Sequence, residues 1–396
     1  MDKKPLGVYV HIPFCQRKCL YCDFNSYDNK TELKENYTKA LIGEISAFCA
    51  DEYFIDSIFF GGGTPTTLPL EMLDAIFKAI TDKFTIAPDA EISCETNPGV
   101  LADHTPLKAM GFNRLSMGLQ SANDDELKRL GRIHTYSEFL KSYENARKIF
   151  DNINIDTMFA LPDQTVESWT NTLERVKGLA PEHISCYSLI VEDGTPFAKM
   201  PLKLPDEETD RQMYYITKDI LSDYNRYEIS NYAKDGFECR HNIKYWTRMP
   251  YIGFGCGAHS QINHERFSNQ YNIADYIKKQ AEPAPGSRTA SVQTPMHAPK
   301  SCVLSDGVKN PFRKEVITLS EKDEISEFIF LGLRMTKGVD KLRFKELFGK
   351  SIEDIFSVEI SRHIKAGTLI SNESSLHLTD RGIDVSNSVM ADFILE

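Results

Sequence analysis

The sequence predicts an α/β fold, built as a partial barrel of six strand–helix units with a mainly helical domain at its C-terminal end. Three observations support this. Short apolar runs alternate with amphipathic stretches through the first half of the chain, and helix-like segments dominate the last 80 or so residues. Motifs rich in glycine, cysteine and polar residues follow the apolar runs, as expected for a site at the C-terminal ends of barrel strands.

The strand-like runs carry the predicted sheet and lie at residues 8–11, 57–61, 91–95, 114–118, 154–158 and 184–189. Amphipathic stretches between them predict the covering helices, at residues 31–49, 70–83, 123–129, 137–150 and 166–178. Repeated strand–helix units indicate a parallel sheet covered by helices. We therefore expect residues 1–205 to form the partial barrel.

The rest of the chain divides into three segments. Residues 206–282 begin with a predicted helix at 207–222 and carry a motif around His241. Residues 283–311 mix five prolines with Ala, Ser and Thr, which predicts a long loop or linker without chemistry of its own. Residues 312–396 contain three helix-like segments and a hairpin-like pair at 367–370 and 376–379, an order that resembles a winged-helix module.

Composition excludes several classes of function. The 396 residues are 26% charged and carry a net charge of -11, so no basic surface suits non-specific nucleic-acid binding. No apolar run approaches the roughly 20 residues that cross a bilayer, and the N-terminus lacks a signal-peptide core. Nine cysteines without a secretory signal argue against a disulfide framework and favour a cytoplasmic location.

Three cysteines form a tight run just behind the first strand: Cys15, Cys19 and Cys22, in a C-x3-C-x2-C spacing. Three thiolates can hold an iron–sulfur cluster by three corners, whereas four normally close it. The remaining iron can then chelate a small molecule through an amino and a carboxylate group. A zinc site would need a fourth ligand and usually a second cysteine pair, which the sequence lacks. Three unrelated buried cysteines within eight residues are a poor alternative.

Polar residues follow four further strands. A carboxylate at a strand end can accept both hydroxyls of a ribose, and an arginine can pair with a carboxylate through two hydrogen bonds. Each residue alone is more simply explained by a loop or a helix cap, but together they predict a cofactor site. The set consists of Gly62, Gly63 and Thr64 in the motif that ends the second strand, Glu95 at the end of the third, Gln120 at the end of the fourth with Arg132 one short helix later, and Asp156 at the end of the fifth.

The ordered motifs resemble the oxygen-independent coproporphyrinogen III oxidase group of radical S-adenosylmethionine (SAM) proteins, from about residue 9 to 278 and again from 319. The resemblance implies that Cys15, Cys19 and Cys22 bind a [4Fe-4S] cluster whose open iron takes SAM. The SAM contacts that it implies are Tyr9, Tyr21, Gly62, Gly63, Thr64, Glu95, Gln120, Arg132 and Asp156. The shared segments are Tyr9-Val-His-Ile-Pro-Phe-Cys15, Gly61-Gly-Gly-Thr-Pro65, Glu95-Thr-Asn-Pro98, Gly118-Leu-Gln-Ser121, Leu130-Gly-Arg132, and Asp156 with Leu161-Pro-Asp163.

Two departures point to a sister branch, the HemW-type heme chaperones. Phe24 stands where the oxidases have a further cysteine, and the long arm that precedes the cluster in the oxidases is absent before Cys15. The segment His241-Asn-Ile-Lys-Tyr-Trp246 resembles the H-N-x-x-Y-W signature of that branch and implies that His241 ligates heme.

Other residues near the motif suit heme. Tyr245 and Trp246 offer flat faces to a porphyrin, Lys244 or Arg240 can pair with a propionate, and Cys256 or His259 can provide a second axial ligand. Core packing, a capped turn and glycine-rich packing explain the same residues without heme.

The resemblance implies a heme chaperone that binds a [4Fe-4S] cluster, SAM and heme and transfers heme to an acceptor protein. Whether cluster and SAM act as a sensor or in reductive SAM cleavage, which needs an electron donor, stays open. The alternative is an oxygen-independent coproporphyrinogen III oxidase, which decarboxylates propionates to vinyl groups, and a weaker one is a radical-SAM enzyme with a non-porphyrin substrate. No nucleic-acid partner and no membrane span is expected, although peripheral contact with a membrane acceptor stays open.

Overall fold

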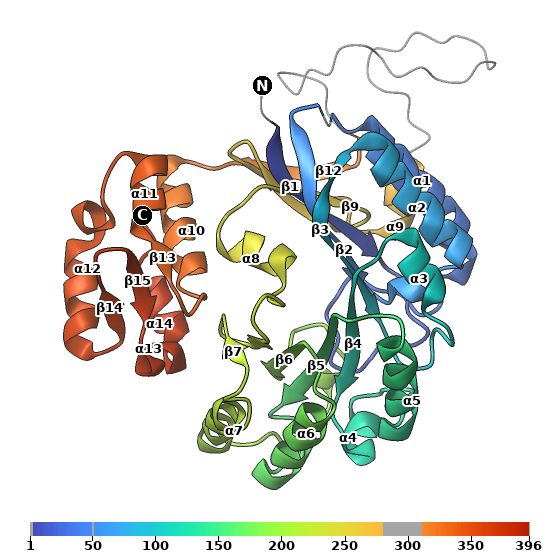
Figure 1. The fold of residues 1–396 in the computed structure, drawn as a ribbon, viewed down its shortest axis with the longest axis horizontal. Coiled ribbons are helices and arrows are strands. Elements are labelled where there is room, and N and C mark those ends of the chain that lie inside the picture. Colours follow the sequence, from blue (N-terminus) through green and yellow to red (C-terminus); the bar gives the residue numbers. More distant parts are fainter. Residues whose placement is uncertain (1–2, 50, 280–310, 396) are drawn as a thin grey trace.

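The computed structural model describes residues 3–49, 51–279 and 311–395 (Figure 1). The proline-rich linker expected at 283–311 lies outside the described residues except for Pro311. The described chain forms a curved sheet covered by helices, with a smaller helical domain beside it, as Figure 1 shows. This confirms the predicted α/β fold class.

All six expected strands are present and pair in parallel in chain order. Side chains alternate along them: Leu6, Val8 and Val10 are fully buried in the main hydrophobic core, whereas Tyr9 faces the inside of the barrel. The strands are β1 (Lys4–Ile12), β2 (Tyr53–Gly62), β3 (Thr85–Thr96), β4 (Arg114–Gln120), β5 (Ile153–Phe159) and β6 (His183–Ser188).

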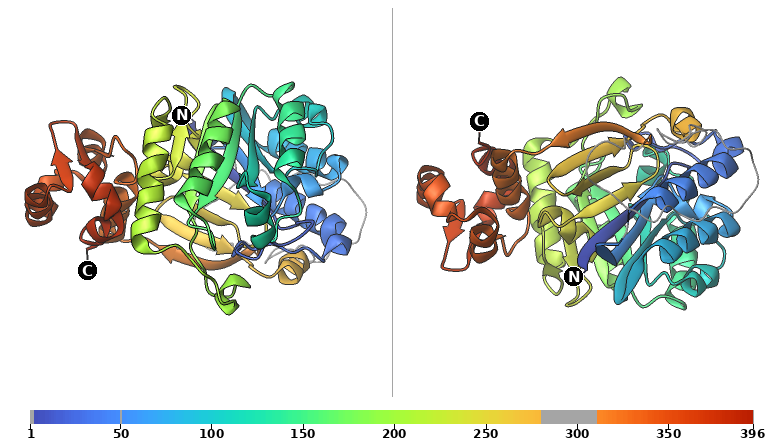
Figure 2. Two further views of the ribbon diagram at one scale, coloured as in Figure 1. Left: turned by 90° about the horizontal axis from the view of Figure 1, so that it is seen from below. Right: turned by 90° about the horizontal axis from the view of Figure 1, so that it is seen from above.

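Helices cover the outer face of this sheet (Figures 1 and 2). In α2, Leu73, Ile76, Phe77 and Ile80 are buried, a spacing that places them on one side of a helix. Burying each such side chain contributes about 2 kcal/mol. The helices are α1 (Lys34–Ala47), α2 (Leu70–Lys83), α3 (Thr105–Met110), α4 (Asp124–Arg129), α5 (Tyr136–Arg147), α6 (Val166–Gly178) and α7 (Glu207–Ile220), with 3-10 turns at Thr31–Leu33, Pro65–Thr67 and Phe197–Lys199.

The segment after the barrel extends the sheet at both edges, which the sequence did not predict. On one side β9 (Tyr251–Phe254) pairs in parallel with β1, and β10 (His259–Ile262), β11 (Glu265–Asn269) and β12 (Arg313–Thr318) follow in antiparallel order. On the other side β8 (Asn231–Ala233) and β7 (Asn225–Arg226) continue from β6. These strands have two to six residues each, too few for a clear alternation in sequence. Helix α9 (Ile273–Lys279) ends this segment.

The C-terminal domain has its own core and projects from one side of the barrel (Figure 2). Its hairpin was expected, and a third short strand completes an antiparallel sheet in the order β13-β15-β14. Phe344, Leu376 and Phe393 are fully buried between the sheet and the helices. The elements are α10 (Glu321–Gly332), β13 (Val339–Asp340), α11 (Lys341–Phe348), α12 (Ile352–Ala366), β14 (Leu369–Ser371), β15 (Ser375–Leu378), α13 (Asp380–Asp384) and α14 (Ser386–Ala391).

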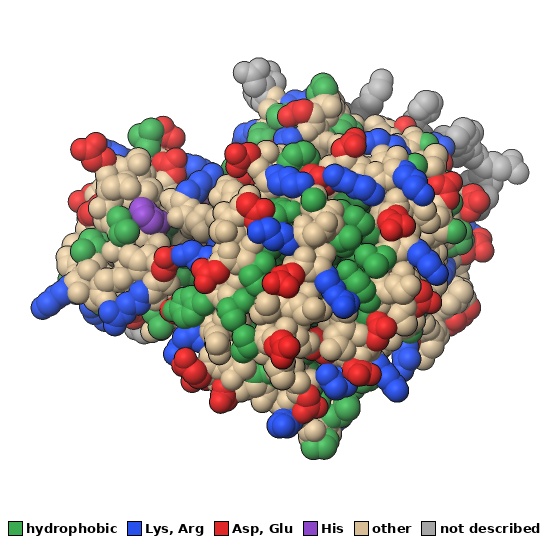
Figure 3. Space-filling view, turned by 60° about the horizontal axis from the view of Figure 1, so that its bottom comes forward, with side chains coloured by type: hydrophobic (Ala, Val, Ile, Leu, Met, Phe, Trp, Pro, Cys, Tyr) green, Lys and Arg blue, Asp and Glu red, His purple; other side chains and the backbone are tan. Residues whose placement is uncertain are grey.

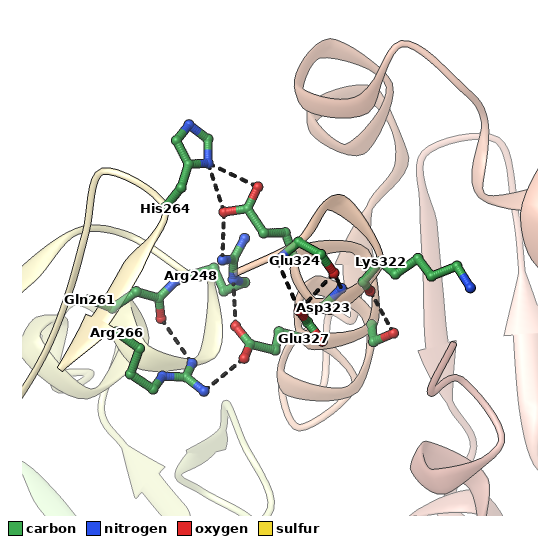
Figure 4. A network of polar contacts seen from close by, with 10 residues as sticks. Arg248, Gln261, His264, Arg266, Lys322, Asp323, Glu324 and Glu327 are labelled. Carbon is green, nitrogen blue, oxygen red and sulfur yellow. Dashed lines mark hydrogen bonds and ion pairs between the residues drawn. The ribbon is translucent and has the colours of Figure 1, made fainter. Parts of the chain in front are cut away.

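A buried charge network joins this domain to the barrel (Figure 4). Arg248 Nε donates to Glu327 Oε2 and its Nη2 donates to Glu324 Oε1, each at 3.0 Å. Arg266 Nη1 lies 2.7 Å from the second oxygen of Glu327. The side chains of Arg248, Glu324 and Glu327 are 8–14% exposed. Separating the two domains would therefore break ion pairs that are largely shielded from water.

The surface fits the composition. On the face in Figure 3, Lys and Arg side chains are interspersed with Asp and Glu rather than gathered into a basic area. In the described part of the chain, none of the helices combines the length and hydrophobicity that crossing a bilayer requires. In the described part of the chain seven cysteines have free thiols and Cys49 takes part in a disulfide.

Candidate cofactor site

The cysteine loop leaves the C-terminal end of β1 and is held from two sides. Cys15 N donates to Tyr27 O at 2.9 Å, and Leu20 N donates to Leu130 O at 3.0 Å. Cys15, Cys19 and Cys22 are all free and partly exposed. The loop therefore presents three thiols near the strand ends, where sequence spacing predicted them.

The three thiols are not gathered around a single point. Within the described residues no group of three His, Cys, Asp or Glu side chains converges closely enough for one metal ion. A cubane cluster does not need that convergence, because each thiolate binds a different iron. Burial raises the pKa of the Cys22 thiol to about 11 and also raises that of Cys15, so without a metal both are protonated at neutral pH.

Two of the cysteines are linked through a chain of hydrogen bonds at the strand ends. Thr64 Oγ1 donates to Cys15 Sγ at 3.8 Å and accepts from Asn97 Nδ2 at 2.7 Å. Arg132 Nη2 donates to Asn97 Oδ1 at 2.6 Å, and its Nη1 donates to Cys19 Sγ at 3.5 Å. Asn97 was not among the residues selected from the sequence, although it follows the expected Glu95 by two positions in the Glu-Thr-Asn-Pro segment.

The glycine turn after β2 sits against Glu95. Gly62 N donates to Glu95 Oε2 at 3.1 Å. The turn requires glycine at Gly62, where φ is +110° and a Cβ atom would lie 2.5 Å from the His11 ring. The N–H groups of Gly63 and Thr64 donate to the carbonyls of Ile12 and Phe14, which leaves carbonyl oxygens as the backbone groups available to a ligand here.

Arg132 lies near two more of the expected residues, Gln120 and Tyr21. Its Nη2 also donates to Gly118 O at 2.6 Å, close to Gln120 at the end of β4. Tyr21 from the cysteine loop is buried near the Arg132 guanidinium group, whose charge lowers the tyrosine pKa, although burial raises that pKa by more. Arg132 is thus a junction between the loop and the fourth strand.

Inside the barrel, four expected residues line one cavity of about 200 Å³: Tyr9, Glu95, Asp156 and His241. Asp156 accepts from Ser116 Oγ at 2.9 Å and from Asn154 Nδ2 at 2.8 Å. Burial and the Asp156 charge raise the pKa of Glu95 to about 8. The remaining lining residues are Phe59, Arg114, Ser116, Asn154, His183, Ser185, Tyr187, Asn242 and Tyr245.

His241 belongs to α8 (Arg240–Trp246), which packs between the barrel and the C-terminal domain (Figure 1). Its ring is fully buried and stacks on Phe59 with centroids 5.5 Å apart. Nδ1 lies 3.0 Å from Ser57 Oγ and Nε2 lies 2.8 Å from Tyr245 Oη. Burial, with Lys244 and Arg114 adding to it, lowers the His241 pKa to about 3, so the imidazole is neutral. Both ring nitrogens are engaged by the protein.

The other residues of this motif have protein partners. Lys244 Nζ lies 2.7 Å from Asp56 Oδ2 in a largely buried pair. Arg240 Nη1 donates to Asp89 O at 2.6 Å, and Arg334 of the C-terminal domain stacks over Trp246 at 4.3 Å. These contacts account for the propionate-binding and porphyrin-stacking candidates as parts of the fold.

The two residues considered as second axial ligands lie elsewhere. Cys256 is fully buried between Asn25 and Tyr37, whereas His259 begins β10, and neither lines the cavity that holds His241. The structure therefore brings Tyr9, Glu95 and Asp156 to one cavity with His241, places Thr64 and Arg132 at a second pocket with Cys19, and keeps Cys256 and His259 apart from the first cavity.

Comparison with known proteins agrees with this geometry. A model of the radical SAM superfamily matches residues 9–176, and a model of the HemN C-terminal domain matches residues 319–385. In fold, the chain matches coproporphyrinogen III oxidase (HemN) from Escherichia coli, a radical SAM enzyme, with a TM-score of 0.81 at 23% identity over 99% of this chain and 90% of that one.

Similarity in sequence is higher to another group. The chain is 36% identical to the heme chaperone HemW of Bacillus subtilis, over 98% of this chain and 99% of the relative. It is 34% identical to the heme chaperone HemW of Lactococcus lactis, over 100% and 99% of the two chains. With nearly the whole of both chains aligned at this identity, the protein belongs to the HemW heme chaperone family of radical SAM proteins.

Proposed function

We propose that this protein is a heme chaperone that binds a [4Fe-4S] cluster, SAM and heme and transfers heme to an acceptor protein. The observation that carries the proposal is the convergence on one barrel mouth of three free thiols, the Gly62–Glu95 turn and the Arg132 junction. Membership of the HemW family, whose relatives are named heme chaperones, supports the heme part. We propose that the protein acts in the cytoplasm.

The donor set at the mouth fits the cluster. Cys15, Cys19 and Cys22 would each bind one iron, and Arg132 beside Cys19 would offset the negative charge of the thiolates. A bound cluster would supply one electron for the reductive cleavage of SAM if the protein catalyses that step. The protein's part is to keep this corner ordered through the Thr64, Asn97 and Arg132 hydrogen bonds.

The residues behind the cysteines fit SAM. Within the described residues the Glu95 side chain accepts one hydrogen bond, from Gly62 N, so it has capacity left for the two hydroxyls of a ribose. Arg132 would receive the carboxylate of the methionine end, and backbone carbonyls around Gly62 and Gly63 its ammonium group. Tyr9, Tyr21, Thr64, Gln120 and Asp156 would complete the contacts.

We propose that His241 binds the heme iron, which requires one of its ring nitrogens to be free. The imidazole is neutral, as an axial ligand must be, but both nitrogens carry hydrogen bonds. Ligation therefore requires that the ring give up Tyr245 or Ser57. A cavity of about 200 Å³ holds only part of a porphyrin, so most of a bound heme would lie outside the lumen.

The experiment that tests the proposal is a hemin titration of the anaerobically reconstituted protein, followed by the Soret band. We expect saturation near one heme per chain, and a loss of binding in His241→Ala. His259→Ala, a histidine away from the cavity, is the matched control and should bind as the wild type does. Wild-type protein that shows no specific hemin binding, or that converts coproporphyrinogen III to a divinyl product, contradicts the chaperone proposal and favours the oxidase. Saturable transfer of bound heme to apo-cytochrome would support it further.

A further inference from the structure

The inside of the barrel is unusually polar around Arg114. Barrel interiors are normally filled by layers of branched apolar side chains. Here the register places Glu95 beside Ser116, Ser116 beside Asn154, and Asn154 beside His183, which forms one polar layer across four strands. Arg114 lies two residues before Ser116 on β4 and so faces the same lumen, one step deeper.

Arg114 is a buried cation whose side chain makes no hydrogen bond or ion pair with the residues that the structure describes. It is 2% exposed, lines the cavity, and its Nε atom has no hydrogen-bond partner. Among the described residues, no carboxylate forms an ion pair or a hydrogen bond with its guanidinium group. An unpaired buried charge is costly, so its retention points to a negatively charged ligand.

The nearby carboxylates are already occupied by other donors. Glu91 accepts from the backbone N–H groups of Arg240 and His241, at 3.0 and 3.1 Å. Asp156 accepts from Ser116 and Asn154. The negative charges of these acids offset part of the Arg114 charge through space. Neither of the two carboxylates accepts a hydrogen bond from the N–H groups of its planar guanidinium.

The rest of the cavity indicates which anion fits. Of the residues that line it in the described structure, Arg114 is the only Lys or Arg, and His183 is kept neutral by burial, which lowers its pKa. The Asp156 carboxylate in the same cavity would repel a dianion such as a phosphate more strongly than a monoanion. One guanidinium group facing a monoanion matches a carboxylate, which it can bind through two parallel hydrogen bonds.

We propose that Arg114 binds the carboxylate of a ligand group that reaches into the barrel lumen. A cavity of about 200 Å³ accommodates a short acid or the acid arm of a larger molecule. Tyr187 lines the cavity and is 38% exposed, so the cavity reaches the surface of the barrel beside this residue. The carboxylate belongs either to a free short-chain acid or to a porphyrin propionate. Only the second source rests on the proposed heme function.

The first test uses sodium propionate as the probe on the full, anaerobically reconstituted chain. We expect propionate to raise the Tm of the wild type relative to sodium chloride at the same ionic strength, and to bind Arg114→Gln about ten- to a hundredfold more weakly. Arg381→Gln, which removes an exposed arginine of the C-terminal domain, should behave as the wild type. If Arg114→Gln does not fold, Arg114→Lys keeps the charge, loses the fork and should bind propionate with intermediate affinity.

The second test separates the two sources of carboxylate. If the porphyrin supplies it, hemin dimethyl ester should bind the wild type more weakly than hemin, and propionate should compete with hemin. If a free acid supplies it, propionate should bind through Arg114 without changing the hemin titration. The proposal is overturned when propionate stabilises the wild type no more than chloride does, or equally in the wild type and Arg114→Gln. A wild type that binds no hemin contradicts the proposed function but leaves the propionate comparison intact.

Discussion

The Nε2 atom of His241 lies 2.8 Å from the hydroxyl oxygen of Tyr245, one helical turn further along α8. Ser57 engages the other ring nitrogen at 3.0 Å. Because both positions are taken, an iron atom can bind this imidazole only after one hydrogen bond breaks. Tyr245 is the more dispensable partner, since it shares a short helix with His241, whereas Ser57 is fixed in the central strand β2.

Replacing Tyr245 with phenylalanine tests this relationship. Because Tyr245→Phe frees Nε2 at the cost of about 1 kcal/mol of hydrogen bonding, we expect hemin to bind about fivefold more tightly than to the wild type. Tyr251→Phe is the control, since Tyr251 packs against the Tyr245 ring at 4.6 Å without touching the histidine. A hemin affinity that is unchanged in Tyr245→Phe would show that Nε2 is not the ligand atom.

The cysteine loop gives a spectroscopic prediction. Cys19→Ala should lose the visible absorbance of the iron–sulfur cluster after anaerobic reconstitution, because two thiolates hold the cluster by only two corners. Cys186→Ala removes a buried thiol of the main core and should keep the full absorbance per folded chain. The assignment of the loop fails if Cys19→Ala retains the wild-type iron and sulfide content.

A buried carboxyl group predicts a pH dependence of stability. Glu44 accepts hydrogen bonds from Gly255 N, Asn269 and Tyr276, yet burial raises its pKa from 4.5 to about 7. The folded state therefore binds more protons than the unfolded state between these values, and the free energy of unfolding falls as the pH rises from 4.5 to 7.

Glu44→Gln should remove this dependence, which amounts to roughly 3 kcal/mol over the whole range. The measurement is urea unfolding of both proteins at several pH values between 4 and 8. Glu35→Gln, an exposed carboxyl on the same helix, should leave the wild-type slope in place. Parallel curves for the wild type and Glu44→Gln would contradict the assignment.

The domain junction predicts a large loss of stability from one arginine. Arg248→Ala leaves Glu324 and Glu327 without their shared cation in a mostly buried interface, and we expect a cost of about 3 kcal/mol. Limited proteolysis should also cut the chain faster between the barrel and α10. Arg211→Ala breaks only exposed pairs on α7 and should cost less than about 0.5 kcal/mol. Equal unfolding midpoints for the two variants would show that the network does not join the domains.

The local pattern of apolar residues was enough to predict the main strands and helices of this protein. The six strands, most covering helices and the hairpin of the C-terminal domain lie where apolar periodicity placed them. Short elements were missed, among them α3 and strands β7 to β13, because two to six residues carry too little periodicity to be recognised. The parallel order of the strands also predicted that Cys15, Glu95 and Arg132 lie at one edge, since parallel strands end on the same side. Asp156 was expected at the end of its strand but lies in the middle of β5.

Only the tertiary structure decided what each of those side chains touches. The sequence offered Lys244 as a partner for a propionate, but the chain supplies Asp56, 188 residues earlier, as its partner. The sequence also suggested His241 as a heme ligand, but Ser57 and Tyr245 each lie within hydrogen-bond distance of one of its ring nitrogens. Arg114 was not singled out in the sequence, yet its buried guanidinium group makes no hydrogen bond or ion pair with the described residues. Spacing fixes which face of a strand a residue occupies, whereas its hydrogen bonds and charge balance depend on residues that only the closed barrel brings near.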